Sequence, residues 1–136
     1  MLRRDFISKI IEQMVNAVAR LLELNGKEEP QKFLNQFDEL MNTYFKLNSD
    51  KLNLLLENEE ERDALLLDEK LKNYQIRMFI DAGFAFIETE QSEKAKICVQ
   101  IIERIQQQHS NVFEFPTIES SKITQDLIEL KELISV

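Results

Sequence analysis

The chain has 136 residues, of which 43% are hydrophobic, and it contains only two glycines and two prolines. That length favours one domain with its own core. The shortage of turn residues and the lack of long apolar–polar alternation predict an all-α fold. The formal charge of −8, with Lys and Arg scattered along the chain, argues against nucleic acid as a partner, since phosphate contacts need a basic face.

The first predicted helix runs from about Leu2 to Leu24 and is apolar around most of its perimeter, so we expect it to pack against at least two neighbours. Asn25-Gly26 predicts its end, with a left-handed residue after the last turn. An amphipathic membrane helix is the alternative, but the narrow polar stripe carries both signs of charge. The stripe consists of Asp5, Lys9, Glu12, Asn16, Arg20 and Glu23.

Arg3 and Arg4 stand at the start of this helix, where the backbone dipole disfavours positive charge. A solvated helix end explains them, as does pairing with an acidic loop elsewhere in the chain or contact with a partner. They are therefore candidate residues of an interaction surface.

The opening sequence MLRRDFI, followed by Ile11-Glu12-Gln13, is similar to the start of an uncharacterised family of short bacterial all-helical proteins with tetratricopeptide-like hairpins. The resemblance extends to the Gly26-Lys27 turn, the helix after it, and the segment Leu52 to Leu67. It implies a bacterial source and a helical hairpin fold. It implies no functional residue, because the function of the family is unknown.

A second helix is predicted from Glu29 or Pro30 to about Lys46, completing a first helical hairpin over residues 1–46. Its apolar face is expected to lie against the first helix. Residues 47–68 are then expected to form short helices and an acidic turn, NEEERD, at residues 58–63. This turn predicts a solvated helix start rather than a metal site, because it lacks the glycine and the alternating oxygen ligands of a calcium loop.

The central element is the helix from Leu71 to Glu88, whose only polar line contains Arg77 and Asp81. Such a helix must be covered almost all round. Phe84 falls on the polar line, and either another helix of the chain or a second subunit or partner is expected to cover it. Gly83 predicts the close approach of a neighbouring helix, which we take to be the next helix in the chain.

That next helix runs from about Gln91 to His109, and the short turn before it forces an antiparallel pair over residues 69–109. Six residues distributed over these two helices have a spacing that resembles a tetratricopeptide repeat, and the resemblance implies a right-handed stack of hairpins. Gln107 replaces the proline that usually closes such a repeat. The six positions are Phe79, Gly83, Phe86, Ala95, Val99 and Ile102.

Pro116 predicts an extended segment from Ser110 to Thr117, whose Phe113 and Phe115 are expected to hold it against the bundle. A terminal helix then follows within residues 117–135. Its apolar stripe is expected to cap the last hairpin or, alternatively, to pair with its own copy in a homodimer. The stripe consists of Ile123, Leu127, Leu130 and Ile134, with Ile128 and Leu133 beside it.

The residue inventory disfavours most catalytic chemistry, and we predict no catalytic, cofactor-binding or metal-binding residue. His109 is the only histidine and Cys98 the only cysteine, which removes catalytic triads, di-iron bundles and structural zinc. Two isolated glycines cannot form a phosphate-binding loop. His109 is expected to interact with the dipole of its own helix, at the C-terminal end, and Cys98 to be a buried thiol in a reducing cytoplasm.

The sequence therefore predicts a single non-enzymatic domain that binds an unknown protein or peptide, with no membrane span. The candidate surface is Arg3, Arg4, Arg77, Asp81 and Phe84. The alternative is a structural homo-oligomer, motivated by Phe84 and the long apolar perimeter of the first helix. An enzyme or a small-ligand binder is the weakest hypothesis.

Overall fold

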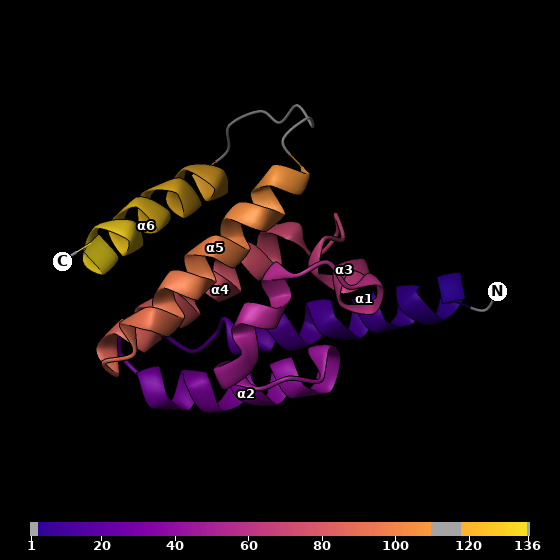
Figure 1. The fold of residues 1–136 in the computed structure, drawn as a ribbon, viewed down its shortest axis with the longest axis horizontal. Helices are drawn as coiled ribbons and strands as arrows, with labels where there is room; N and C mark the ends of the chain where they lie inside the picture. Colours follow the sequence, from indigo (N-terminus) through magenta and orange to yellow (C-terminus); the bar gives the residue numbers. More distant parts are fainter. Residues whose placement is uncertain (1–2, 110–117, 136) are drawn as a thin grey trace.

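The computed structural model describes residues 3–109 and 118–135, with the side chains of residues 3–5 and 119 excepted (Figure 1). These residues contain no strand, which confirms the all-helical prediction. The predicted extended segment with Phe113 and Phe115 lies outside the described residues. The elements are α1 (Arg3–Leu21), α2 (Pro30–Phe45), the 3-10 helix η1 (Ser49–Leu56), α3 (Glu60–Leu66), α4 (Lys72–Glu88), α5 (Ser92–Gln108) and α6 (Ile118–Ser135).

Helix α4 is the centre of the fold. It lies against α1, α2, α5 and α6, and ten of its 17 residues are buried. This confirms that the helix is covered almost all round. Its burial follows from composition, because an apolar helix with one thin polar line must find neighbours on nearly every side.

Helices α4 and α5 form the predicted antiparallel hairpin, joined by residues 89–91 (Figure 1). The turn closes with the Glu90 amide donating to the Ile87 carbonyl and the Gln91 amide donating to the Phe86 carbonyl. Glu90 has φ 60°, the left-handed conformation that this helix ending requires. All six positions of the repeat-like pattern are buried in the described core.

Aromatic rings join α2 to the central hairpin. The Phe37 ring meets the Phe79 ring edge-on at 5.9 Å and the Phe86 ring at 6.1 Å, and Phe33 stacks beside it. Helix α2 also touches α1, as predicted, but its apolar face turns toward α4 as well. The sequence pattern therefore predicted the apolar face of α2 and its contact with α1, but not its contact with α4.

Gly26 does not have the predicted left-handed conformation, since neither glycine has a positive φ. A Cβ atom at Gly26 would stand 2.5 Å from the backbone oxygen of Asp81 in α4. The glycine therefore allows the α1–α2 loop to approach the α4 backbone, a requirement of packing rather than of a turn. Among the non-glycine residues that the structure describes, Lys46 and Glu90 have a positive φ.

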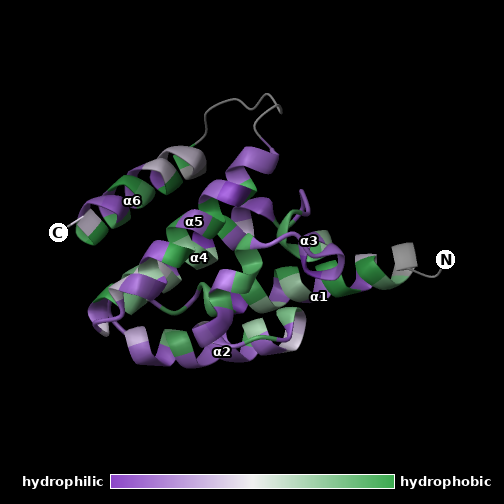
Figure 2. Ribbon diagram, viewed as in Figure 1, coloured by the Kyte–Doolittle hydropathy of each residue, from purple (hydrophilic) through white to green (hydrophobic). Residues whose placement is uncertain are grey.

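Helix α1 contacts two neighbours, α2 and α4, as predicted. Ile11, Met14, Val18 and Leu21 on its inner face are buried, whereas Phe6 is 63% exposed. The first turns of α1 extend beyond the rest of the molecule, where apolar residues continue on the helix (Figures 1 and 2).

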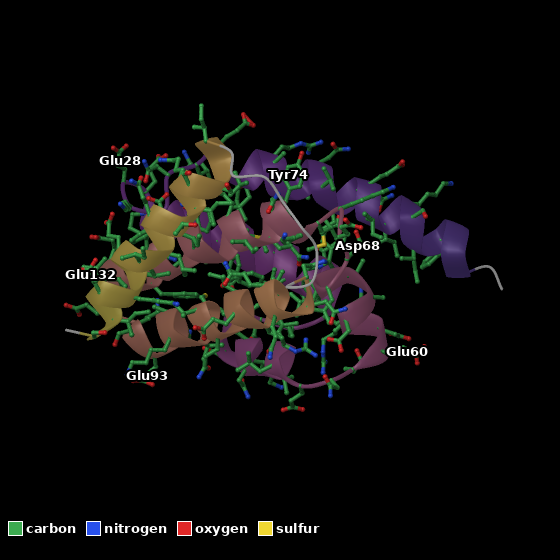
Figure 3. The ribbon with its side chains drawn as sticks, turned by 90° about the horizontal axis from the view of Figure 1, so that it is seen from above. Glu28, Glu60, Asp68, Tyr74, Glu93 and Glu132 are labelled. Atoms are coloured by element: carbon green, nitrogen blue, oxygen red, sulfur yellow. The ribbon has the colours of Figure 1, made fainter. Side chains whose placement is uncertain are left out.

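The acidic turn is a helix start, as predicted. Glu59 precedes α3, and its carboxylate accepts hydrogen bonds from the Glu61 and Arg62 amides. Acidic side chains there also interact favourably with the positive end of the helix. Glu60 points outward at the edge of the molecule, as do Glu28, Glu93 and Glu132 (Figure 3).

Helix α6 lies along the central hairpin and touches both α4 and α5 (Figure 1). Its residues Ile123, Leu127 and Leu130 are buried, whereas Ile128 and Leu133 are exposed. Three of the four residues of the predicted apolar stripe are therefore buried against the same chain, and the fourth, Ile134, is partly buried.

Candidate functional site

Of the five predicted surface residues, the structure brings three together on α4: Arg77, Asp81 and Phe84. Arg3 and Arg4 belong to α1, but their side chains lie outside the described residues. The three residues of α4 face α6 and the loop between α1 and α2 rather than an open surface.

Arg77 joins α4 to α6. Its Nη1 donates to Asp126 Oδ2 at 2.7 Å, and its Nη2 donates to Asp81 Oδ1 at 2.9 Å. About four fifths of each of these side chains is shielded from solvent. Lys122 Nζ, 3.9 Å from Asp126, adds a second and more exposed cation. The cluster is therefore an ion network at the contact between two helices.

Asp81 and Asp126 share the Arg77 guanidinium. Burial raises the pKa of Asp81 above its ordinary value, and Arg77 beside it opposes that rise. Burial also disfavours the charged form of Arg77, but the two carboxylates outweigh this effect and its net pKa is raised. Arg77 thus remains a fixed cation toward α6.

Phe84 is 3% exposed and is covered by the chain itself. The ammonium group of Lys27, from the α1–α2 loop, lies 4.2 Å from the centre of the Phe84 ring. The same Lys27 Nζ donates to Glu129 Oε2 of α6 at 3.0 Å. The first of the two predicted covers, another part of the same chain, is the one observed, so Phe84 offers no surface to a second subunit.

Gly83 approaches α6, not the next helix in the chain as the sequence predicted. The three atoms closest to a Cβ built at Gly83 all belong to Leu130, at 2.6, 3.1 and 3.4 Å. Leu130 is fully buried. The prediction of a close helix approach was right, and its identification of the neighbour was wrong, because a terminal helix packs on the side of α4 that carries Gly83.

Ion pairs border α6 on both sides of its buried stripe. On one side, Asp126 pairs with Arg77 of α4 and Glu129 with Lys27 of the α1–α2 loop; on the other, Lys131 Nζ lies 3.4 Å from Glu103 Oε2 of α5. We call the surface made by Lys27, Arg77, Gly83 and Glu103 the α6-binding face. Asp126 and Glu129 were not predicted from the sequence, although they lie one turn apart beside the predicted stripe.

A second polar cluster, also missed from sequence, fastens η1 and α3 to α5. Arg104 Nη1 donates to Asp63 Oδ1 at 2.8 Å and to the Leu55 carbonyl at 3.1 Å, and its Nη2 donates to Asn58 Oδ1 and Asp63 Oδ2. The hydrogen bonds from Arg104 hold the pKa of the Asp63 carboxyl below its ordinary value. With every contact made to the chain itself, this cluster acts as a clamp.

Side chains also satisfy the carbonyl groups at the end of α3. The buried Gln75 Nε2 donates to the Leu65 and Leu66 carbonyls at 3.1 and 3.0 Å. His109 Nε2 lies 3.2 Å from the Leu67 carbonyl, at the negative end of that helix. The carbonyls of Leu65, Leu66 and Leu67 at this helix end therefore have side-chain partners, whereas the buried Gln75 Oε1 accepts no hydrogen bond.

Within residues 3–109 and 118–135, no group of three His, Cys, Asp or Glu residues is placed to hold a metal ion. Cys98 is fully buried, as predicted, and burial raises the pKa of its thiol. No described helix has the length and apolar character needed to cross a bilayer. The chemistry evident in this part of the chain is that of helix packing and ion pairing.

Comparison of the chain with protein-family models, with curated proteins and with solved structures gives no match.

Proposed function

We propose that this chain is a non-enzymatic helical protein–protein interaction module, and that the α6-binding face is its binding surface. The observation that carries the proposal is the way the face holds α6. Leu130 lies over Gly83, and ion pairs flank the stripe on both sides. A surface that combines apolar contact with flanking charges is the usual means by which a protein recognises an amphipathic helix.

A tetratricopeptide-like right-handed stack, with α6 as its capping helix, is the architecture we propose for this module. Burial of the six repeat-like positions in the α4–α5 hairpin supports it, as does the position of α6 against that hairpin. A cytoplasmic location agrees with a lone cysteine that is fully buried.

Affinity capture from a lysate of the source organism tests the proposal. A tagged Gly83→Val chain, in which a side chain fills the face, should lose a partner that the wild type retains. Ala19→Val, at an exposed position of α1, is the matched control and should retain it. Thermal melts of both variants establish that the fold persists. If every protein retained by the wild type is also retained by Gly83→Val, the face is not the binding surface.

The exposed start of α1 favours a second candidate function, a structural homo-oligomer. Phe6 is 63% exposed, and Ile7 and Ile10 beside it are partly exposed. An apolar patch of this kind is a natural contact between copies. Sedimentation at micromolar concentration decides: a dimer that Phe6→Ser dissociates supports this function, and a monomer removes it.

A further inference from the structure

The apolar register of α6 defines what the α6-binding face accepts. The space above Gly83 takes the Leu130 side chain, and a Cβ at residue 83 would come within 2.6 Å of it. Ile123 and Leu127, seven and three residues earlier, are buried on the same stripe. A helix seated here thus needs large apolar residues at three positions, the last of them opposite Gly83.

The charged flanks of α6 define the direction of the helix and its acidic side. Relative to Leu130, the acidic residues Asp126 and Glu129 stand at −4 and −1 and meet Arg77 and Lys27. Lys131, at +1, faces the opposite flank and pairs with Glu103. A helix bound in the reverse direction, or one with basic residues at −4 and −1, would meet charges of its own sign.

We propose that this face binds an acidic amphipathic helix of a partner protein, and that α6 is the competitor held in the same chain. The partner helix carries apolar residues at −7, −3 and 0, acidic residues at −4 and −1, and a basic residue at +1. Complementarity of charge and of shape with the face is the argument, and the inference rests on the proposed function, because it specifies the ligand of that same surface.

Competition follows from the covalent connection of α6 to the face it occupies. A segment of the same chain is present at a high effective concentration, so a helix added from solution binds only the fraction of molecules in which α6 has left. A change that weakens α6 without altering the face should therefore increase the apparent affinity for an added helix.

The test uses full-length chains and a fluorescein-labelled peptide with the sequence of residues 118–135. Asp126→Arg places a second cation beside Arg77 and weakens the contact of α6 with the face. In anisotropy titrations, we expect this chain to bind the peptide at least tenfold more tightly than the wild type does. Glu132→Arg is the matched control, because it makes the same charge change on the exposed side of α6 and should behave like the wild type (Figure 3).

Two further comparisons examine the charge pattern. A peptide with Lys at positions 126 and 129 should bind the Asp126→Arg chain at least tenfold more weakly than the acidic peptide does. Adding Arg77→Asp to the Asp126→Arg chain restores an ion pair between α4 and α6 and places an anion opposite the acidic peptide. We expect the double variant to bind that peptide no better than the wild type does.

The outcomes separate this inference from the proposed function. If the acidic and lysine peptides bind with equal affinity, the face binds helices but does not prefer acidic ones. That result would overturn this inference and would not affect the proposed function. Absence of saturable binding by either peptide would remove both. A dimer of the Asp126→Arg chain that the acidic peptide dissociates would assign the face to α6 of a second copy and overturn the partner proposed here.

Circular dichroism monitors the folding of each variant. Glu129→Lys, at a half-exposed position, is a milder variant expected to tighten binding about threefold.

Discussion

The side chain of Leu130 occupies the space that a side chain at residue 83 would need. Leu130 Cδ2 would lie 2.6 Å from a Cβ at Gly83, a distance that real Cβ atoms do not tolerate without a shift. Helix α4 thus carries a glycine in its interior, at a loss of about 1 kcal/mol of helix propensity, where α6 crosses it.

The first prediction is that Gly83→Ala has opposite effects in two backgrounds. In a Leu130→Ala chain the space is empty, so Ala should stabilise α4 by about 1 kcal/mol. In the wild type, overpacking against Leu130 should exceed that gain and lower stability by about 1–2 kcal/mol. Urea unfolding of the four chains measures the coupling. Equal effects in both backgrounds would show that residues 83 and 130 do not meet.

The second prediction is that Gly26→Ala destabilises the protein by about 1–3 kcal/mol. Its Cβ would meet the backbone oxygen and carbon of Asp81, at 2.5 and 3.2 Å, and these backbone atoms can move only if helix α4 itself shifts. Glu28→Ala, two residues further on at an exposed position, is the control and should change stability by less than about 0.5 kcal/mol. Chemical denaturation should rank the first variant clearly below the second.

The two glycines also show how far the sequence predicts this fold. Periodicity gave the helices, because an apolar stripe is a local property that 3.6 residues per turn reveals. The need for a close approach at Gly83 was also visible locally, in the glycine itself. The identity of the helix that approaches was not, because the choice between α5 and α6 depends on how helices distant in sequence share the surface of α4.

The candidate site shows the same limit. Arg77, Asp81 and Phe84 stood out because they interrupt an apolar helix, and the structure does bring them together. Lys27 and Asp126 lie far away in sequence, on a loop and on another helix. Nothing in the spacing of charges along one helix indicates a partner 49 residues away, as Asp126 is from Arg77. Pairing of this kind is decided by tertiary packing.

The third prediction concerns the Arg104 clamp and pH. Arg104→Ala should lower stability at pH 7 by about 1.5–3 kcal/mol, since several hydrogen bonds to a charged group are lost at once. Arg104 holds the pKa of Asp63 below its usual 3.8, so the contribution of this pair is present above pH 3.8 and is lost as pH falls through the lower value in the folded state. The difference between the variant and the wild type should therefore shrink below pH 3.8. Urea unfolding at pH 7 and pH 3 measures it, and a difference that grows on acidification would contradict the assignment.

The fourth prediction is that Cys98 is inert in the folded protein. Its thiol is fully buried, and burial raises its pKa, so little reactive thiolate forms at neutral pH. Modification by a thiol reagent at pH 8 should be at least about a thousandfold slower than in the urea-unfolded chain, because it requires opening of the core. Rapid modification of the native protein would mean that α5 opens locally.

The last prediction is that Glu90→Gly stabilises the protein by about 1 kcal/mol. Glu90 follows the end of α4 with φ 60°, and its amide and that of Gln91 close the helix on the Ile87 and Phe86 carbonyls. A left-handed conformation at this position strains residues with a Cβ and leaves glycine unstrained. Because the Glu90 side chain is exposed, little else should change. Glu88→Gly, two residues earlier at the last position of the helix, is the matched control and should destabilise by up to about 1 kcal/mol. Thermal and urea unfolding of both variants give the comparison, and a loss of stability in Glu90→Gly would contradict the role assigned to this turn.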